Sequence, residues 1–70
     1  MEDRKAFKAW CVTHDVKQKD IADLLGISVQ AANLKINGKK PFSLRQVAVI
    51  CEAYHISADL FISKELQIYN

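Results

Sequence analysis

Apolar residues recur along this chain at the i, i+3, i+4 spacing of amphipathic helices, in short segments separated by turn-forming residues. The first segment covers residues 2–14, where the sequence HDV interrupts it, and the second covers residues 18–25. Gly26 follows the second segment and predicts a helix end, because a helix terminus commonly needs a left-handed residue. The positions expected to face inward are Ala6, Phe7, Trp10, Cys11, Ile21, Ala22, Leu24 and Leu25.

The stretch GISVQAANLKING predicts a third helix. Ser28 is expected to cap its N-terminus, since a serine hydroxyl can accept a hydrogen bond from the free amides of the first turn. The helix is expected to reach Ile36, where the dipeptide NG ends it. In the following GKKPF, Pro41 keeps the residue before it out of the helical conformation, so a loop is predicted there.

Two more helices complete the pattern. Ser43 and Gln46 form a capping box at the start of a fourth helix, and Ser57 can cap a short fifth helix over ADLFI. The apolar stripe of the fourth helix consists of Leu44, Val47, Ala48, Ile50, Cys51 and Tyr54. The sequence therefore predicts an all-α fold of five helices in one domain.

Length and composition fit a small globular domain. The chain has 70 residues, of which 50% are hydrophobic and 26% charged, so a core is possible but there is little room for a catalytic cleft. No apolar run approaches the roughly 20 residues of a membrane span, and the start MEDRK leads into no signal-peptide core, so we expect a cytoplasmic protein. The tail KELQIY suits an edge strand or a frayed helix equally.

The net charge of +2 is unevenly distributed. Between Asp23 and Glu52 lie four basic residues and no acidic one, while the rest of the chain holds six basic and eight acidic residues, so the middle carries +4 and the flanks −2. Such a basic surface indicates an anionic partner, most commonly nucleic acid. On charge alone, a solvated face that keeps the protein soluble is an equally good interpretation.

The sequence lacks the parts of an enzyme. Cys11 and Cys51 are too few and too far apart for a disulfide framework or a zinc site, and we expect buried, reduced thiols. No serine, cysteine or paired carboxylate has a plausible base beside it, and no glycine-rich phosphate loop is present. We therefore expect no catalytic residue, no metal and no cofactor.

The joint spacing of small and apolar residues around Gly26 narrows the choice among helical hairpins. Ala22 lets two helices cross closely, Gly26 supplies the turn, and apolar residues fill the angle, as in a helix-turn-helix. The segment KQKDIADLLGISVQAANLKINGKKPFSLRQVAVICEAYHISADLF resembles the helix-turn-helix domain of the phage Cro and repressor (XRE-like) family, over about residues 4–62. The glutamine opening the second helix, IA..LGIS, NGK and IS.D.F all match in register.

The resemblance implies a compact five-helix domain over residues 1–63, followed by a tail at 64–70. It implies a transcriptional regulator of phage or prophage origin that binds double-stranded operator DNA sequence-specifically as a homodimer. The third helix becomes the recognition helix, in which Gln30 and Asn33 can pair with an adenine edge and Val29 can contact a thymine methyl group. The positions implied to face bases or the groove are Ser28, Val29, Gln30 and Asn33, and those implied to contact phosphates are Gln18, Asn37, Lys39 and Lys40.

These residues also have structural interpretations. Gln18 and Asn33 suit plain solvated helix positions, and Asn37 suits a helix end at least as well as a phosphate contact. Lys39 and Lys40 are equally compatible with solvated loop positions. The large aromatic residues are interpreted as core rather than stacking platforms, and they are Trp10, Phe42, Tyr54 and Phe61.

The chain departs from the family pattern at two places. Lys35 and Ile36 are exchanged, and because Ala32 and Ile36 form an i, i+4 pair expected to be buried, Lys35 is predicted to turn outward toward a phosphate. His55 replaces the glycine that is frequent after the fourth helix, where a left-handed conformation is expected, and a structural role is favoured over a pH switch.

Protein binding is the alternative function. Some small phage proteins of this fold are antirepressors, which bind another helix-turn-helix regulator and cover its DNA-reading surface. The third helix here has no arginine and exposes Val29, Ala31 and Leu34, an apolar face that suits packing against a partner. The resemblance and the basic middle region favour operator DNA as the partner, and a phage repressor protein is the alternative.

Overall fold

The structure, a computed structural model, describes residues 6–61. Within them the chain forms four α-helices and no strand, and a 3-10 helix, Ala58–Phe61, follows. The α-helices are α1 (Ala6–Thr13), α2 (Gln18–Leu25), α3 (Val29–Ile36) and α4 (Leu44–Tyr54). The all-helical prediction is confirmed for this part of the chain. Predictions for residues 1–5 and for the tail at 64–70 lie outside the described residues.

The predicted count of five helices is not confirmed. The last segment begins where Ser57 predicts it, and the serine Oγ accepts a hydrogen bond from the N–H of Asp59 at 3.1 Å. It forms a 3-10 helix of four residues instead of an α-helix. A cap residue marks where a helix can begin, but it does not determine how far the helix continues.

The starts of three helices follow from side-chain caps. The Asp20 carboxylate accepts from the backbone N–H of Lys17 at 2.9 Å, just before α2. Ser28 Oγ accepts from Ala31 N–H at 3.0 Å, at the start of α3. Both bonds of the capping box predicted for α4 are present between Ser43 and Gln46. These starts agree with the sequence prediction because capping is a local interaction.

The helix ends show left-handed residues where they were expected and at one further position. Gly26 after α2 has a φ of 70° and His55 after α4 has a φ of 56°, as the sequence predicts. Asp15, in the turn after α1, also has a positive φ of 57°. Aspartate tolerates this conformation better than most residues, but the sequence HDV predicted only a break in the helix there.

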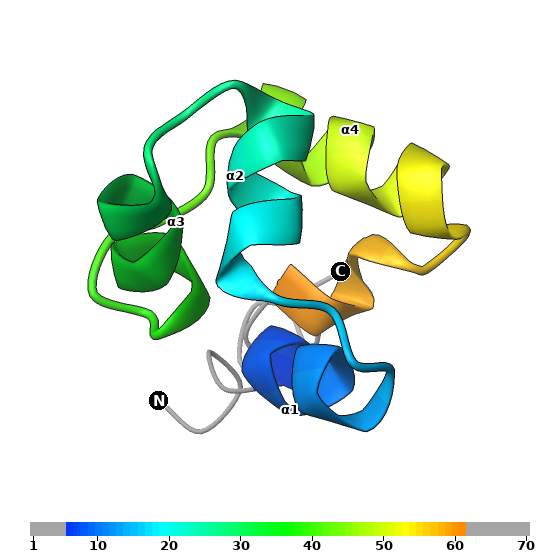
Figure 1. The fold of residues 1–70 in the computed structure, drawn as a ribbon. Helices are drawn as coiled ribbons and strands as arrows, with labels where there is room; N and C mark the ends of the chain where they lie inside the picture. The colour runs from blue at the N-terminus through cyan, green and yellow to red at the C-terminus, as the bar shows by residue number, and fades with distance from the viewer. Residues whose placement is uncertain (1–5, 62–70) are drawn as a thin grey trace.

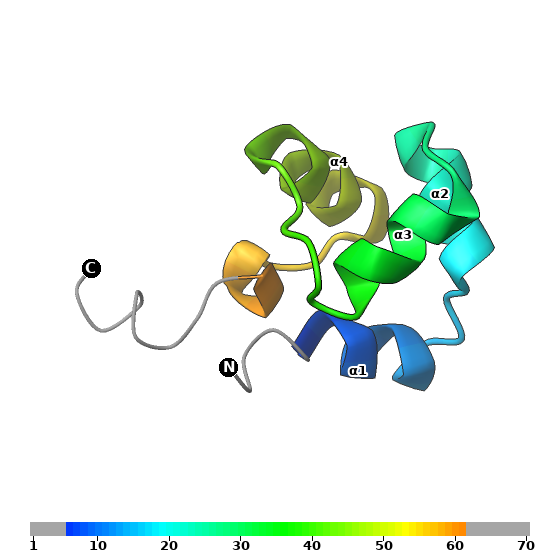
Figure 2. The ribbon, with the colours of Figure 1, turned by 90° about the vertical axis from the view of Figure 1, so that its left-hand side faces the viewer.

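The four helices enclose a small core, and α2 is the central helix of the arrangement. In Figure 1, α3 lies on one side of α2 and α4 on the other, while α1 and the 3-10 helix lie together at the opposite end. The fully or nearly fully buried side chains come from all four α-helices, and they are Phe7, Cys11, Ile21, Ala22, Ala32, Ile36 and Ile50. In the view of Figure 2, α3 lies on the side of the molecule nearest the reader.

Aromatic side chains close the end of the core near α1. Phe7 packs against Phe61 with ring centroids 4.6 Å apart and meets Phe42 edge-on at 5.6 Å. Trp10 stacks on Phe7 and contacts Tyr54 edge-on at 5.2 Å. These rings pack against the buried core, which confirms that they are structural.

Three apolar residues predicted to face inward lie at the surface instead. Leu44 is 90% exposed, Leu24 is 37% exposed, and Ala48 is also exposed. The prediction was wrong for each because periodicity gives the direction of a side chain on its helix but not whether a neighbour covers it. Leu44 opens the first turn of α4, whose buried residue, Ile50, comes later in the helix.

None of the helices within residues 6–61 has the length and hydropathy needed to cross a membrane.

Candidate nucleic-acid interface

α3 is held at one side of the molecule by the short turn that joins it to α2. The left-handed Gly26 ends α2 and donates its N–H to the carbonyl of Ala22. Ser28 then opens α3 by accepting from Ala31. The end of α2 and the start of α3 therefore depend on Gly26 and Ser28, as the stretch GISVQAANLKING predicts.

α2 and α3 pack against each other, and each buries a small residue. Ala22 of α2 and Ala32 of α3 are 2% and 0% exposed, with Ile21 and Ile36 buried beside them. The expected Ala32–Ile36 pair is confirmed. Burying this face of α3 leaves its opposite face, with Val29 and Gln30, at the surface.

A shallow hollow lies on this exposed side, at the junction of α2 and α3. It is lined by one residue of α2 and four of α3, namely Gln18, Val29, Gln30, Asn33 and Leu34. The structure thus brings together five of the residues that the sequence analysis selected. No carboxylate is among these lining residues.

The side chains of the hollow combine free amides with apolar surface. Gln30 is exposed, Asn33 is half-buried, and neither side-chain amide is hydrogen-bonded to another residue within 6–61. Val29 is 48% exposed and Leu34 is half-buried. Such a surface offers hydrogen-bond donors and acceptors beside methyl groups, which suits a base edge and equally suits a protein side chain.

The predicted site residues beyond α3 lie on the loop that leaves it. Lys39 and Lys40 are exposed, and their backbone N–H groups donate to the carbonyl of Leu34 at 2.8 and 3.2 Å. Asn37 Nδ2 donates to the carbonyl of Asn33 at 2.8 Å, so Asn37 caps the end of α3. Lys35 Nζ donates to the carbonyl of Pro41 at 2.9 Å. A phosphate contact by Lys35 would have to replace that bond.

Gln18 connects this hollow with a second one. The second hollow lies between α1, the start of α2 and the end of α3, and Gln18 and Asn37 both line it together with Lys8, Asp15 and Lys17. The two amides that the sequence analysis placed at phosphate positions therefore share one concave surface.

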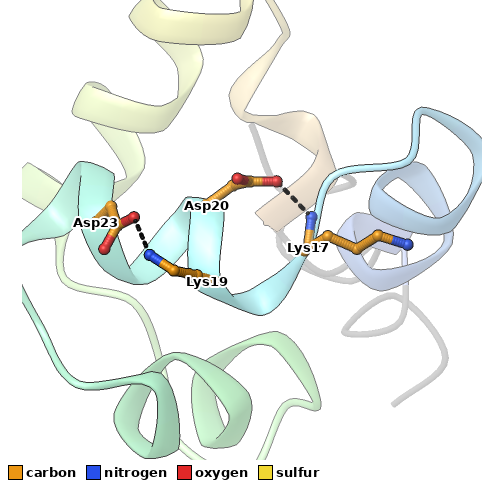
Figure 3. A network of polar contacts seen from close by, with 4 residues as sticks. All are labelled: Lys17, Lys19, Asp20 and Asp23. Atoms are coloured by element: carbon orange, nitrogen blue, oxygen red, sulfur yellow. Dashed lines mark hydrogen bonds and ion pairs between the residues drawn. The ribbon is translucent and has the colours of Figure 1, made fainter.

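Charged pairs flank Gln18 on both sides along the chain. Lys17 Nζ lies 2.8 Å from Asp15 Oδ1, and Lys19 Nζ lies 3.0 Å from Asp23 Oδ2. The hydrogen bond with Lys17 lowers the pKa of the Asp15 carboxyl, and the hydrogen bonds with Asp15 and Asp23 raise the pKa values of Lys17 and Lys19. Figure 3 shows these lysines with Asp20 and Asp23.

Lys17 and Lys19 were not selected from the sequence. Their signals were the i, i+4 spacing of Lys19 and Asp23 on a helix and the position of both lysines next to Gln18. In the distribution of charge along the chain, both lysines fall in the flanks, whose net charge is negative.

No group of histidine, cysteine and carboxylate side chains that could hold a metal ion occurs in residues 6–61. Cys11 and Cys51 are free thiols, the first buried and the second half-buried.

The described residues define an all-helical domain whose candidate site is a surface hollow at the junction of two short helices that pack against each other. The family model of the BetR domain matches residues 4–67, and the chain belongs to that family. No curated protein and no solved structure matches the chain.

Proposed function

We propose that this protein is a sequence-specific DNA-binding transcriptional regulator of the Cro/repressor type. The observation that carries the proposal is the hollow formed by Gln18 and α3, where unpaired amides and apolar side chains meet without a carboxylate. A major groove presents hydrogen-bonding edges and thymine methyl groups to a helix of this kind. The exposed Lys39 and Lys40 on the next loop add positive charge for the phosphate backbone.

In this proposal the protein acts by binding alone, without catalysis or a cofactor. It works in the cytoplasm of a bacterial host as a homodimer on a palindromic operator, which follows from the resemblance to phage regulators. Gln30, Asn33 and Val29 read bases, while Gln18 and the loop lysines hold phosphates. Ser28 contributes mainly by starting α3, because its Oγ already accepts from Ala31 N–H.

The test is a titration of labelled duplex DNA from the intergenic region of the protein's own locus, followed by fluorescence anisotropy over a range of salt. Because only cationic side chains neutralise phosphates, Lys39 and Lys40 of the two subunits account for about four neutralised phosphates, and a dimer should give a log–log salt slope of about −4, from roughly −0.9 per neutralised phosphate. A slope near zero contradicts the proposal.

Two variants separate base reading from phosphate binding. Gln30→Ala should cost about 1–3 kcal/mol at the base pair that Gln30 reads and leave binding to unrelated sequences unchanged. Lys39→Ala should weaken binding to all sequences alike and reduce the salt slope by about 0.9 per subunit. Equal behaviour of the two variants would contradict the assignment of roles.

A second candidate is an antirepressor that binds a phage repressor and blocks its DNA-binding surface. The observation that favours it is the 48% exposure of Val29 next to Leu34 in the same hollow. Exposed apolar side chains on a short helix suit burial against a protein partner. The same titration, repeated with the neighbouring repressor of the locus in place of DNA, tests it.

A further inference from the structure

Two lysines lie at the start of α2, Lys17 just before the helix and Lys19 in its first turn. Lys17 and Lys19 lie on either side of Gln18 in sequence, and each holds an aspartate at ion-pair distance, 2.8 Å to Asp15 and 3.0 Å to Asp23. All four side chains are well exposed, between 68% and 82%. The pairs therefore lie in solvent, where an ion pair contributes little to stability and exchanges readily.

One of the two pairs lines the second hollow, and the other lies along α2. Lys17 and Asp15 line the second hollow with Gln18 and Asn37. Lys19 and Asp23 form an i, i+4 pair along α2, and Figure 3 shows Asp20 directed away from them. Both lysines thus belong to the end of α2 at which the proposed DNA backbone arrives.

We infer that Lys17 and Lys19 are further phosphate contacts and that Asp15 and Asp23 compete with DNA for them; this rests on the proposed DNA-binding function. When a duplex approaches, a phosphate oxygen replaces the aspartate carboxylate as acceptor and the ammonium keeps its proton. The carboxylates of Asp15 and Asp23 then lie close to the phosphate backbone of the DNA. Both groups are negatively charged, and their repulsion opposes binding. Asp15 and Asp23 therefore keep the sequence-independent affinity for DNA low. As a result, the base contacts of the α3 amides supply a larger share of the binding free energy.

The test uses the full chain with Asp15→Asn, Asp23→Asn and the double variant, each titrated with a random-sequence duplex over a range of salt. Glu52→Gln is the matched control, because it makes the same change in net charge on the exposed surface of α4. Figure 1 shows the end of α4 across the molecule from α3. Circular dichroism of each variant checks that it is folded before it is titrated.

Each single aspartate variant should bind the duplex more tightly at low salt and steepen the log–log salt slope by about 0.9 per subunit, as expected for one more neutralised phosphate. Glu52→Gln should leave the slope unchanged. Adding Lys17→Met to Asp15→Asn, or Lys19→Met to Asp23→Asn, should remove the gain. The inference is overturned if the aspartate variants match Glu52→Gln, or if the gain survives loss of the lysines.

The same experiment separates this inference from the proposed function. If the parent protein binds no duplex while the double variant binds with a salt-sensitive affinity, the competition is supported and DNA binding by the native chain is contradicted. If neither protein binds the duplex, both the DNA-binding function and the competition by Asp15 and Asp23 are contradicted. If the parent binds and the variants do not differ from it, only the competition is contradicted.

Discussion

Ala22 is the residue at which the packing of α2 on α3 is most directly testable. It is 2% exposed, and Ala32 of α3 is 0% exposed. Ala22→Leu adds a branched side chain at a buried position, and we expect it to lower the free energy of unfolding by about 1–3 kcal/mol because the core is overpacked. Ala48→Leu on the exposed surface of α4 is the control and should change stability little. Denaturant unfolding of both variants measures the difference, and equal stabilities would show that the helices do not cross as described.

At Cys11, the pH dependence of stability follows from burial of the thiol. Burial raises the pKa of Cys11 from 9.0 to about 11. The folded protein therefore binds the thiol proton more tightly than the unfolded chain, so this contribution is fully present below pH 9.0 and is lost as pH rises toward about 11. We expect the parent to lose stability over this interval relative to Cys11→Ala. Denaturant unfolding between about pH 8 and about pH 11 measures the free energy of unfolding of both proteins. The same dependence on pH in the two proteins would contradict the prediction.

The same burial gives Cys11 a second measurable property. A thiol with a raised pKa holds little thiolate near neutral pH and reacts slowly with alkylating reagents. Cys51 is only half-buried, so iodoacetamide should modify it before Cys11. Mass spectrometry of peptides from partly alkylated protein reads out the order.

Among the elements, the ends of α2 and α4 form a natural comparison. Both are followed by a left-handed residue, Gly26 with φ 70° and His55 with φ 56°. Because a side chain is strained in this conformation and glycine is not, His55→Gly should stabilise the protein by about 1 kcal/mol. Gly26→Ala should destabilise it by a similar amount through backbone strain alone, since an added Cβ meets no atom within 4 Å. Thermal unfolding measures both, and shifts of the same sign would contradict this explanation.

The boundaries of α2, α3 and α4 were predictable because they depend on residues next to them in sequence. Ser28, Ser43 and Gly26 act through hydrogen bonds and backbone conformations within one turn. The exposure of Leu44 was not predictable, because it depends on how much of α4 the other helices cover. The same limit explains why an i, i+3, i+4 pattern identified the stripe of α4 but not its buried part.

In the candidate site, too, the buried and open sides of one helix were predictable, and particular side-chain contacts were not. The sequence placed Gln30 and Asn33 on the open side of α3 because Ala32 and Ile36 determine the buried side. It did not predict the bond from Lys35 to the carbonyl of Pro41, since that contact depends on the path of the loop. It also missed the ion pairs beside Gln18, because net charge summed along a segment does not show which charges neutralise one another.

For the molecule as a whole, the two candidate functions use the same surface and differ in what happens to its water. If α3 packs against a protein, Val29 and Leu34 become buried anchors, and a charge at either position must be desolvated on binding. If α3 enters a DNA groove, a lysine at either position stays near phosphates and adds to the affinity. The electrostatic effect of one substitution thus has opposite signs for the two partners.

Val29→Lys and Leu34→Lys should therefore be measured against operator DNA and against the neighbouring repressor. Val29 is 48% exposed and begins α3, so its replacement should not disturb the fold, whereas the half-buried Leu34 needs a check of stability by circular dichroism. We expect both variants to keep or increase non-specific DNA affinity, with a salt slope steeper by about 0.9 per subunit, because the added charge neutralises one more phosphate. A repressor complex formed by the parent and abolished in both variants, together with no salt-sensitive DNA binding by the parent, would reverse the order of the two functions.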